Sequence, residues 1–282
     1  MNDLLVYLNG EMVKSSSACI SVSDAGFLHG ASTFTTMLAK NSKVFRLDRH
    51  LRRLGQTVNV LGIKADATVD TLVNAVDEVL RANALADARV RITLTPGPVR
   101  EGRPTTLVTA EPVGDLPRQW YEKGISVVVT SLKAHKGDFM FGYKTGCYLG
   151  RMLARSEAAA KGADDALWFT DQNYLSEACT SNVFLVLDGK VFTPPRDTPV
   201  LPGIVREAVL ELCGELGIPA DDQTPLTVRE MLAAQEAFLT ASVAGIRPVV
   251  RIERHSVGDE KPGEITCRLM KAYEKLLARE CA

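Results

Sequence analysis

Short apolar runs separated by turn residues fill the first part of the chain. Asn9-Gly10 lies between apolar positions, and Lys40-Asn41-Ser42 separates two further apolar runs. Asn-Gly pairs and short polar loops between such runs are typical of β-hairpins. The pattern therefore predicts hairpins over 6–13 and 36–47, and further strands at 89–95 and 105–110, on either side of the loop 96–104.

Helical periodicity follows the second hairpin. Leu51, Leu54, Val58 and Leu61 recur at a spacing near 3.6 residues, and Asp48 precedes them as the expected cap. A second helix is predicted over 70–83, where Leu72, Val76, Val79 and Leu80 form the apolar side.

The pattern changes after Asp115-Leu116-Pro117-Arg118, the best linker candidate. We expect domains at 1–115 and 125–282, joined by a linker at 116–124. Thr227 and Glu230 form a capping box. The remaining predicted elements are a strand at 125–130, a helix from after Lys144 to Lys161, a meander from 166 past Glu177, a hairpin at 183–192 turning at Asp188-Gly189, a helix after Pro202-Gly203, a long strand region at 236–251 and a final helix from about 264. Hairpins grouped with separate helices favour an α+β fold over a doubly wound parallel sheet.

Composition narrows the class of protein. The chain has 282 residues, 46% hydrophobic, with 33 basic and 34 acidic side chains and a formal net charge of -1. This balance disfavours nucleic acid and anionic membranes as partners. The chain begins without a signal-peptide pattern, and no apolar run approaches the roughly 20 residues that span a bilayer. The six cysteines contain no Cys-x-x-Cys pair, so we expect no metal site and a reducing, cytoplasmic location.

Lys144 is the candidate with the most chemical content. It lies in the stretch 139–148, which is otherwise aromatic residues, Met, Gly, Thr and Cys. A buried ammonium is costly, so a lysine here is either paired or has a lowered pKa, and an uncharged lysine is a nucleophile toward carbonyl compounds such as pyridoxal phosphate. The alternative is a lysine that extends to solvent from the edge of a strand.

Four other positions suit the binding of an anion or a cation. Glu177 precedes small polar residues and a buried strand, and is either a solvated turn residue or the partner of a protonated pyridine nitrogen. Gly203 introduces a helix whose first amides, at Ile204 and Val205, suit a phosphate, although every helix has such an end. Arg53 could contact a phosphate or be solvated. The Ser242 hydroxyl could contact a phosphate or form a hydrogen bond with the backbone.

Taken in order, these segments resemble the class IV aminotransferases, the fold type IV family of pyridoxal-phosphate enzymes. The resemblance runs from Tyr7 to Val249. The segments that carry it are His50-Leu51-Arg52-Arg53-Leu54, Lys144 with Tyr148-Leu149, Glu177 with Ser181-Asn182-Val183-Phe184, Leu201-Pro202-Gly203-Ile204 and Phe238-Leu239-Thr240-Ala241-Ser242.

The resemblance implies a two-domain fold, with a smaller N-terminal α/β sandwich domain and a larger C-terminal pseudo-barrel. It implies that Lys144 binds pyridoxal 5'-phosphate covalently and moves the substrate proton, and that Glu177 binds the ring nitrogen. Arg53, Ile204, Val205 and Ser242 would hold the phosphate, with Tyr148 near the cofactor or substrate. Arg100 and Arg103 are candidates for the substrate carboxylate, although solvated loop charges explain them equally well. A homodimer acting on an amino acid and a 2-oxo acid is expected.

Two departures leave the subfamily open. Val205 replaces a frequent threonine, and Phe34-Thr35-Thr36 resembles aminodeoxychorismate lyases, whereas the region of Tyr148 is closer to branched-chain and D-amino-acid aminotransferases. Phe34 and Thr36 are expected on one face of a strand that offers no cation, which favours aliphatic substrates. An aminotransferase is therefore the first hypothesis, a 4-amino-4-deoxychorismate lyase the second and a non-catalytic binding protein the third.

Overall fold

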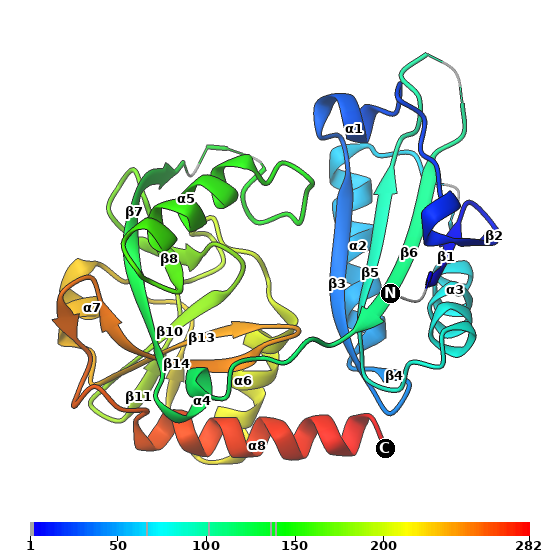
Figure 1. Ribbon diagram of the computed structural model, residues 1–282. Coiled ribbons are helices and arrows are strands. Elements are labelled where there is room, and N and C mark those ends of the chain that lie inside the picture. The colour runs from blue at the N-terminus through cyan, green and yellow to red at the C-terminus, as the bar shows by residue number, and fades with distance from the viewer. Residues whose placement is uncertain (1–2, 66, 101, 136, 139) are drawn as a thin grey trace. The chain divides into compact units, whose positions relative to one another are not determined.

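The computed structural model describes residues 3–65, 67–100, 102–135, 137–138 and 140–282, so Phe139 of the stretch around Lys144 lies outside the described residues. The chain divides into two compact units (Figure 1). Unit 1 comprises Met1–Gly114, Lys144–Cys147 and Leu277–Ala282, and unit 2 comprises Asp115–Tyr143 and Tyr148–Leu276. The proposed domain boundaries at 115 and 125 differ from this division chiefly in the two short segments that group with unit 1.

Unit 1 is built on an antiparallel six-stranded sheet of order β2-β1-β6-β5-β3-β4. Asn9 and Gly10 take positive φ at the β1–β2 turn, as the sequence predicts. The strands are β1 (Leu5–Leu8), β2 (Glu11–Lys14), β3 (Thr33–Lys40), β4 (Lys43–Val44), β5 (Ala88–Thr95) and β6 (Thr105–Pro112).

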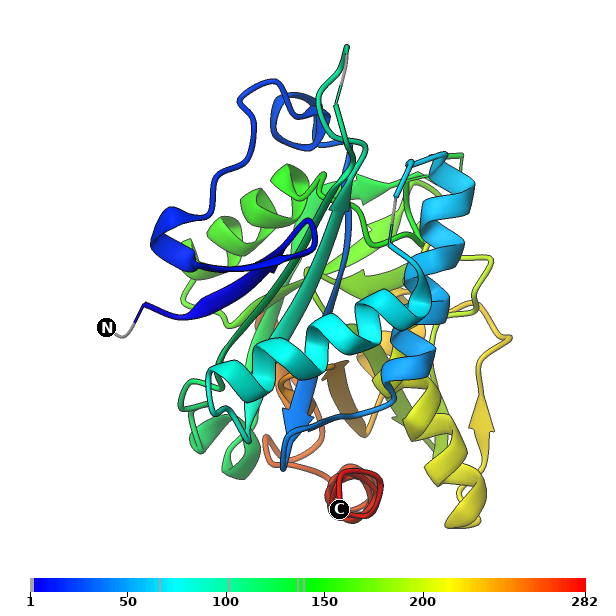
Figure 2. The same ribbon diagram turned by 90° about the vertical axis from the view of Figure 1, so that its right-hand side faces the viewer.

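Two helices cover one face of this sheet, α2 (Leu47–Leu61) and α3 (Val69–Ala82), as Figure 2 shows. Met37 and Ala39 of β3 pack with Leu51 and Leu54 of α2, so alternate β3 residues point into this core. The other alternate set, Phe34 and Thr36 among them, lies on the opposite face of the strand. Two short elements complete the unit, a 3-10 turn (Ser15–Ser17) and α1 (Ala25–His29).

The start of α2 differs from the prediction. The N-cap is Arg46, in the left-handed region at φ 51°, and Asp48 lies inside the first turn, so the expected Asp48 cap is wrong. Asp48 instead forms an exposed ion pair of 3.7 Å with Arg52, one turn along the helix. An acidic residue in the first turn still interacts favourably with the helix dipole.

Unit 2 is built on a mixed nine-stranded sheet of order β12-β11-β10-β13-β14-β7-β8-β9, with β15 beside β14. Adjacent hairpin strands are antiparallel, whereas β7 is parallel to both β14 and β8. The strands are β7 (Ile125–Ala134), β8 (Asp165–Thr170), β9 (Leu175–Ala178), β10 (Asn182–Leu187), β11 (Lys190–Phe192), β12 (Ala220–Asp221), β13 (Glu236–Ala241), β14 (Gly245–Ile252) and β15 (His255–Ser256).

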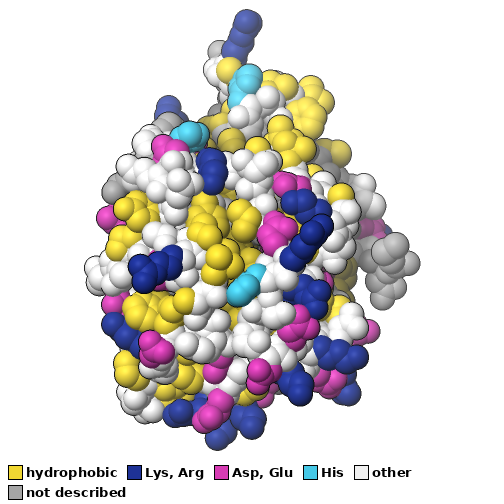
Figure 3. Space-filling view, turned by 90° about the vertical axis from the view of Figure 1, so that its left-hand side faces the viewer, with side chains coloured by type: hydrophobic (Ala, Val, Ile, Leu, Met, Phe, Trp, Pro, Cys, Tyr) yellow, Lys and Arg dark blue, Asp and Glu magenta, His cyan; other side chains and the backbone are white. Residues whose placement is uncertain are grey.

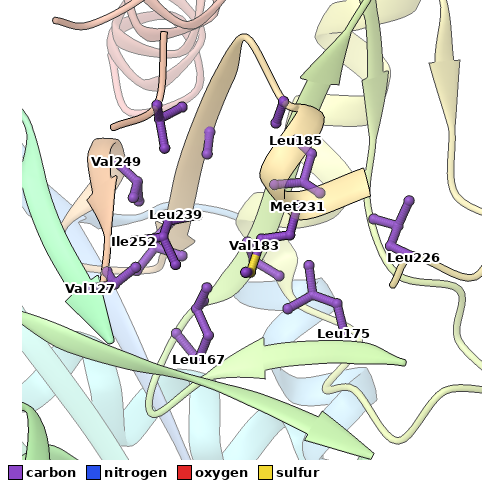
Figure 4. Close-up of a cluster of buried hydrophobic side chains, with 14 of the residues drawn as sticks. Val127, Leu167, Leu175, Val183, Leu185, Leu226, Met231, Leu239, Val249 and Ile252 are labelled. Atoms are coloured by element: carbon purple, nitrogen blue, oxygen red, sulfur yellow. The ribbon is translucent and has the colours of Figure 1, made fainter. Parts of the chain in front are cut away.

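The core of unit 2 gathers apolar side chains from strands that are far apart in the sequence. Figure 4 shows Val127 of β7, Leu167 of β8, Val183 of β10 and Leu239 of β13 converging on one cluster. Each of these side chains is almost fully buried, and burial of such a side chain stabilises the fold by about 1.5–3 kcal/mol. The core therefore fixes the strand that carries Glu177, because Leu175 and Ala178 of β9 belong to the same cluster.

The helices of unit 2 pack against this sheet. The expected linker 116–124 contains the short α4, whose Trp120 packs against the core cluster. The predicted capping box is present at the start of α7, with both Thr227 and Glu230 bonded. The helices are α4 (Gln119–Glu122), α5 (Leu149–Ala160), α6 (Ile204–Glu215), α7 (Val228–Ala233) and α8 (Glu264–Glu280), whose last residues group with unit 1.

The predicted strand region 236–251 is two strands, not one. β13 and β14 form an antiparallel hairpin that closes at the pair Ala241 and Gly245. Ser242 therefore lies in the turn between the strands, and the expectation that its hydroxyl lies within a strand is wrong. Gly245 takes a φ of 62° at the end of the turn, a conformation that glycine adopts without strain.

The distribution of charged side chains on the surface agrees with the balanced charge of the sequence. Acidic and basic side chains are interspersed on the face in Figure 3. In the described part of the chain, no helix combines the length and apolarity needed to cross a bilayer. No cluster of three or more His, Cys, Asp or Glu among the described residues could hold a metal ion. The six cysteines are all free thiols.

Candidate active site

Lys144 is held beside the start of β3 in unit 1. Its carbonyl oxygen accepts hydrogen bonds from the Phe34 amide at 3.0 Å and the Thr33 hydroxyl at 2.9 Å. Gly146 approaches the chain so closely that an added Cβ would lie 2.0 Å from Ser32 Oγ. The backbone that follows the Lys144 side chain is thus fixed, and the Lys144 amine lies 4.9 Å from the centre of the Phe34 ring.

A second cation contacts the same ring. The guanidinium carbon of Arg91 lies 3.6 Å from the ring centre of Phe34, and Arg91 is paired with Thr36 across β3 and β5. Phe34 and Thr36 do share a face, but the expectation that this face offers no cation is wrong. Strand alternation explains the position of Arg91, because Val90 and Ile92 point into the core and Arg91 points away from it. This face combines an apolar ring with a guanidinium suited to a carboxylate.

Beneath the opposite face, Arg53 and His50 project from α2 toward β3. Arg53 Nη2 donates to Thr35 Oγ1 at 3.3 Å, and Thr35 Oγ1 lies 2.8 Å from His50 Nδ1. Burial, together with the charges of Arg53 and Lys144, holds the pKa of His50 well below its usual range. This lowered pKa favours the neutral imidazole, which shares its Nδ1 hydrogen bond with the hydroxyl that accepts from Arg53. Arg53 is buried, whereas Arg52 is exposed, as the predicted register requires.

Glu177 is a buried carboxylate, with 3% of its surface exposed. Its Oε1 accepts from Arg151 Nη2 at 2.5 Å, and its Oε2 accepts from the Leu201 amide at 2.9 Å and from Asn182 Nδ2 at 3.4 Å. A carboxylate oxygen can accept two hydrogen bonds, so Oε1 has room for one further donor. The reading of Glu177 as a solvated turn residue is excluded, and the donor set fits a protonated pyridine nitrogen.

The start of α6 fits a phosphate. None of the side chains that the structure describes caps this helix at Gly203, and a Cβ on Gly203 would lie 1.9 Å from Asn182 Oδ1. Ile204 and Val205 are its first residues, with their side chains buried and their amides at the positive end of the helix dipole. Thr240, in the adjacent β13, has a buried Oγ1 without a hydrogen-bond partner among the described residues. Both observations suit an oxyanion.

The other predicted residues vary in exposure. Tyr148 is half-buried at the start of α5, 5.6 Å from the Arg151 guanidinium, and Ser242 is half-buried in its turn. Arg100 and Arg103 are both exposed on the 96–104 loop of unit 1. Their roles toward a substrate, and the lowered pKa expected for Lys144, stay predictions.

The sequence analysis assigned no role to four of the residues described above: Thr35, His50 and Arg91 in unit 1, and Arg151 in unit 2. A signal existed for Arg91, because the alternation Arg89-Val90-Arg91-Ile92 places both arginines on the polar side of the strand. Arg151 gave no local signal, since its partner Glu177 is 26 positions away.

Comparison with known proteins agrees with this chemistry. Residues 32–252 match the family model described as amino-transferase class IV. The branched-chain-amino-acid aminotransferase of Escherichia coli is 30% identical over 289 residues, covering 98% of this chain and 93% of that protein. Its crystal structure aligns with a TM-score of 0.94, covering 100% of this chain and 97% of that chain at 29% identity.

Two further relatives bear on the cofactor and the reaction. The aminodeoxychorismate lyase of Bacillus subtilis is 28% identical, covering 96% of this chain and 94% of that protein. A branched-chain amino acid aminotransferase solved with pyridoxamine 5'-phosphate aligns with a TM-score of 0.93 at 26% identity, covering 99% of this chain and 96% of that chain. The predicted fold type IV, pyridoxal phosphate cofactor and transaminase chemistry are confirmed, and the chain belongs to the class IV aminotransferases.

Proposed function

We propose that this enzyme transfers amino groups from aliphatic, branched-chain amino acids to a dicarboxylic 2-oxo acid such as 2-oxoglutarate. One observation carries the proposal: the amine of Lys144 and the guanidinium of Arg91 contact the same Phe34 ring. The ring suits an aliphatic side chain, and the guanidinium suits the second carboxylate of the partner substrate.

Each residue has a defined task in this proposal. Lys144 Nζ would hold the cofactor through its aldehyde, and its free amine would move the proton at the substrate α-carbon as general base and then acid. Glu177 keeps the ring nitrogen protonated, and Tyr148 donates a hydrogen bond to the cofactor or the substrate. Arg53, Ser242 and the amides of Ile204 and Val205 bind the phosphate. The bound cofactor supplies the electron sink for the α-carbon.

The decisive experiment offers the purified protein a panel of L- and D-amino acids with 2-oxoglutarate or pyruvate, and aminodeoxychorismate in parallel. We expect transfer from leucine, isoleucine and valine to exceed transfer from aspartate. Borohydride reduction followed by peptide mass spectrometry should place the pyridoxyl group on Lys144, and a label on another lysine would contradict the assignment.

The second hypothesis is the lyase on the same scaffold, which the relative from Bacillus subtilis supports. Pyruvate release from aminodeoxychorismate without an amino acceptor, with negligible transfer from every amino acid tried, would establish it instead. The exposed Arg100 and Arg103 are secondary candidates for the substrate carboxylate in either reaction.

We also propose a homodimer in the cytoplasm. Leu149, Met152 and Leu153 lie on one side of α5 and are 71%, 62% and 54% exposed, an apolar surface that a second copy would cover. Sedimentation analysis should give twice the chain mass, and Met152→Glu should shift it toward the monomer. The six free thiols fit a reducing compartment.

A further inference from the structure

Arg151 forms an ion pair with Glu177 inside unit 2. The distance from Nη2 to Oε1 is 2.5 Å, and the two side chains are 18% and 4% exposed. A buried carboxylate without a counter-charge takes up a proton or moves toward water, because the uncompensated anion is costly. The facing guanidinium supplies the counter-charge for Glu177 at this buried place.

The geometry also fixes the orientation of the arginine. Arg151 Nη1 donates to the carbonyl oxygens of Cys179 at 2.8 Å and Ala178 at 3.3 Å, directly after Glu177 in the chain. Burial favours the neutral form of this side chain, but the charge and hydrogen bond of Glu177, together with the neighbouring Tyr148 and Cys179, raise the pKa of Arg151. The guanidinium therefore spans three acceptors in one rigid arrangement, which a single ammonium group cannot reproduce.

The remaining hydrogen bonds of Glu177 show where its carboxylate can accept a further donor. The Leu201 amide and Asn182 both occupy Oε2, on the side that leads to the start of α6. With the hydrogen bonds of the described residues counted, Oε1 keeps one further acceptor position, and Arg151 sets the direction in which this oxygen points. Arg151 also lies near Tyr148, with its guanidinium carbon 5.6 Å from the ring centre.

We propose that Arg151 is a positioning residue that orients Oε1 of Glu177 toward the ring nitrogen of the cofactor and supplies the counter-charge of this carboxylate. The inference rests on the proposed role of Glu177. Arg151 does not touch the reacting atoms, and its effect on cofactor binding passes through Glu177 alone.

The test compares pyridoxal phosphate with its deaza analogue, in which C–H replaces the ring nitrogen, as ligands of the cofactor-free full-length chain. The ratio of the two affinities isolates the nitrogen contact, since both compounds carry the same aldehyde and phosphate. A charge-assisted contact of this kind gives the native chain a preference of about tenfold or more for pyridoxal phosphate. We expect Arg151→Met and Glu177→Gln each to reduce the preference to less than about threefold, with no further loss in the double variant.

Two further variants separate positioning from stability. Arg155→Met, one turn along α5 at an exposed position, should keep the native preference. Arg151→Lys, which retains the charge but not the fork of donors, should give an intermediate ratio, and it replaces Arg151→Met if that variant does not fold.

The outcomes discriminate between the two proposals. Two results would overturn the role of Arg151 while leaving Glu177 in place. One is a native preference for pyridoxal phosphate in Arg151→Met or Arg151→Lys. The other is that Arg151→Met reduces this preference equally in the native chain and in the Glu177→Gln variant. A native chain that does not distinguish the two compounds would overturn the role of Glu177, and with it the role of Arg151.

Discussion

Thr35 and His50 share a hydrogen bond of 2.8 Å inside unit 1, between the Oγ1 hydroxyl and Nδ1. The same hydroxyl accepts from Arg53, so it connects the proposed phosphate residue to a neutral, buried imidazole. Arg53 is therefore oriented by Thr35 of β3 as well as by its own helix, α2. Two predictions follow, one for His50 and one for Arg53.

The first prediction concerns the pH dependence of stability. Burial lowers the pKa of His50, so below about pH 6.5 the unfolded chain binds a proton that the folded chain does not. This group makes the folded state less stable as the pH falls through that value, by up to about 1.4 kcal/mol per pH unit. His50→Asn should reduce the shift of the urea midpoint between about pH 7.5 and pH 5.5. His29→Asn, at an exposed position of α1, is the control, and an unchanged shift in His50→Asn would contradict the assignment.

The second prediction concerns the phosphate. Arg53→Ala should weaken the affinity of the cofactor-free chain for pyridoxal phosphate by about tenfold or more, because a charge-assisted hydrogen bond is lost. Arg52→Ala removes an exposed arginine of the same helix and should have little effect. Fluorescence titration measures both affinities, and loss of binding in Arg52→Ala alone would show that the register of the His50 motif is wrong.

The contrast between local and distant contacts explains how far the sequence predicted the fold. The 6–13 and 183–192 hairpins and the Thr227 capping box were predicted because turn residues and caps act over a few positions. The break at Ser242-Val243-Ala244 was missed because these residues carry no strong turn signal ahead of Gly245. Asp48 was predicted as the cap from its residue type, whereas the N-cap is Arg46, in the left-handed conformation, and the helix begins at Leu47.

The candidate site divides in the same way. The motifs around Lys144, Glu177 and Arg53 could be recognised because they are short and ordered. The partners that set their chemistry come from other elements: Arg151 reaches Glu177 from α5, and Thr35 reaches His50 from β3. Side-chain pairs of this kind follow from packing, which a linear pattern does not encode.

The third prediction concerns Glu177→Gln. A neutral amide cannot stabilise a protonated ring nitrogen as a carboxylate does, so turnover should fall by at least about a hundredfold. Cofactor affinity should fall far less, by about tenfold, since Lys144 and the phosphate residues are unchanged. Single-turnover rates and cofactor titration measure the two effects, and native turnover with loss of cofactor would assign Glu177 a structural role.

The last prediction separates the two substrates of the transaminase through Arg91. The guanidinium lies 3.6 Å from the Phe34 ring centre, and its Nε donates to Thr93 Oγ1 at 3.0 Å, so Arg91 is oriented along the face that also carries Lys144. A leucine side chain gains nothing from this charge, whereas the side-chain carboxylate of glutamate does.

Arg91→Met should therefore lower kcat/KM for glutamate by about tenfold or more, and kcat/KM for leucine by less than about threefold. Arg89→Met is the matched control, because Arg89 lies two positions away on β5 and pairs with Glu111 at the surface. Equal losses for both amino acids in Arg91→Met would mean that the arginine supports Phe34 alone. A loss of kcat/KM confined to glutamate would mean that one face of the sheet binds both substrates. The Phe34 ring would then contact the leucine side chain, and the Arg91 guanidinium the side-chain carboxylate of glutamate.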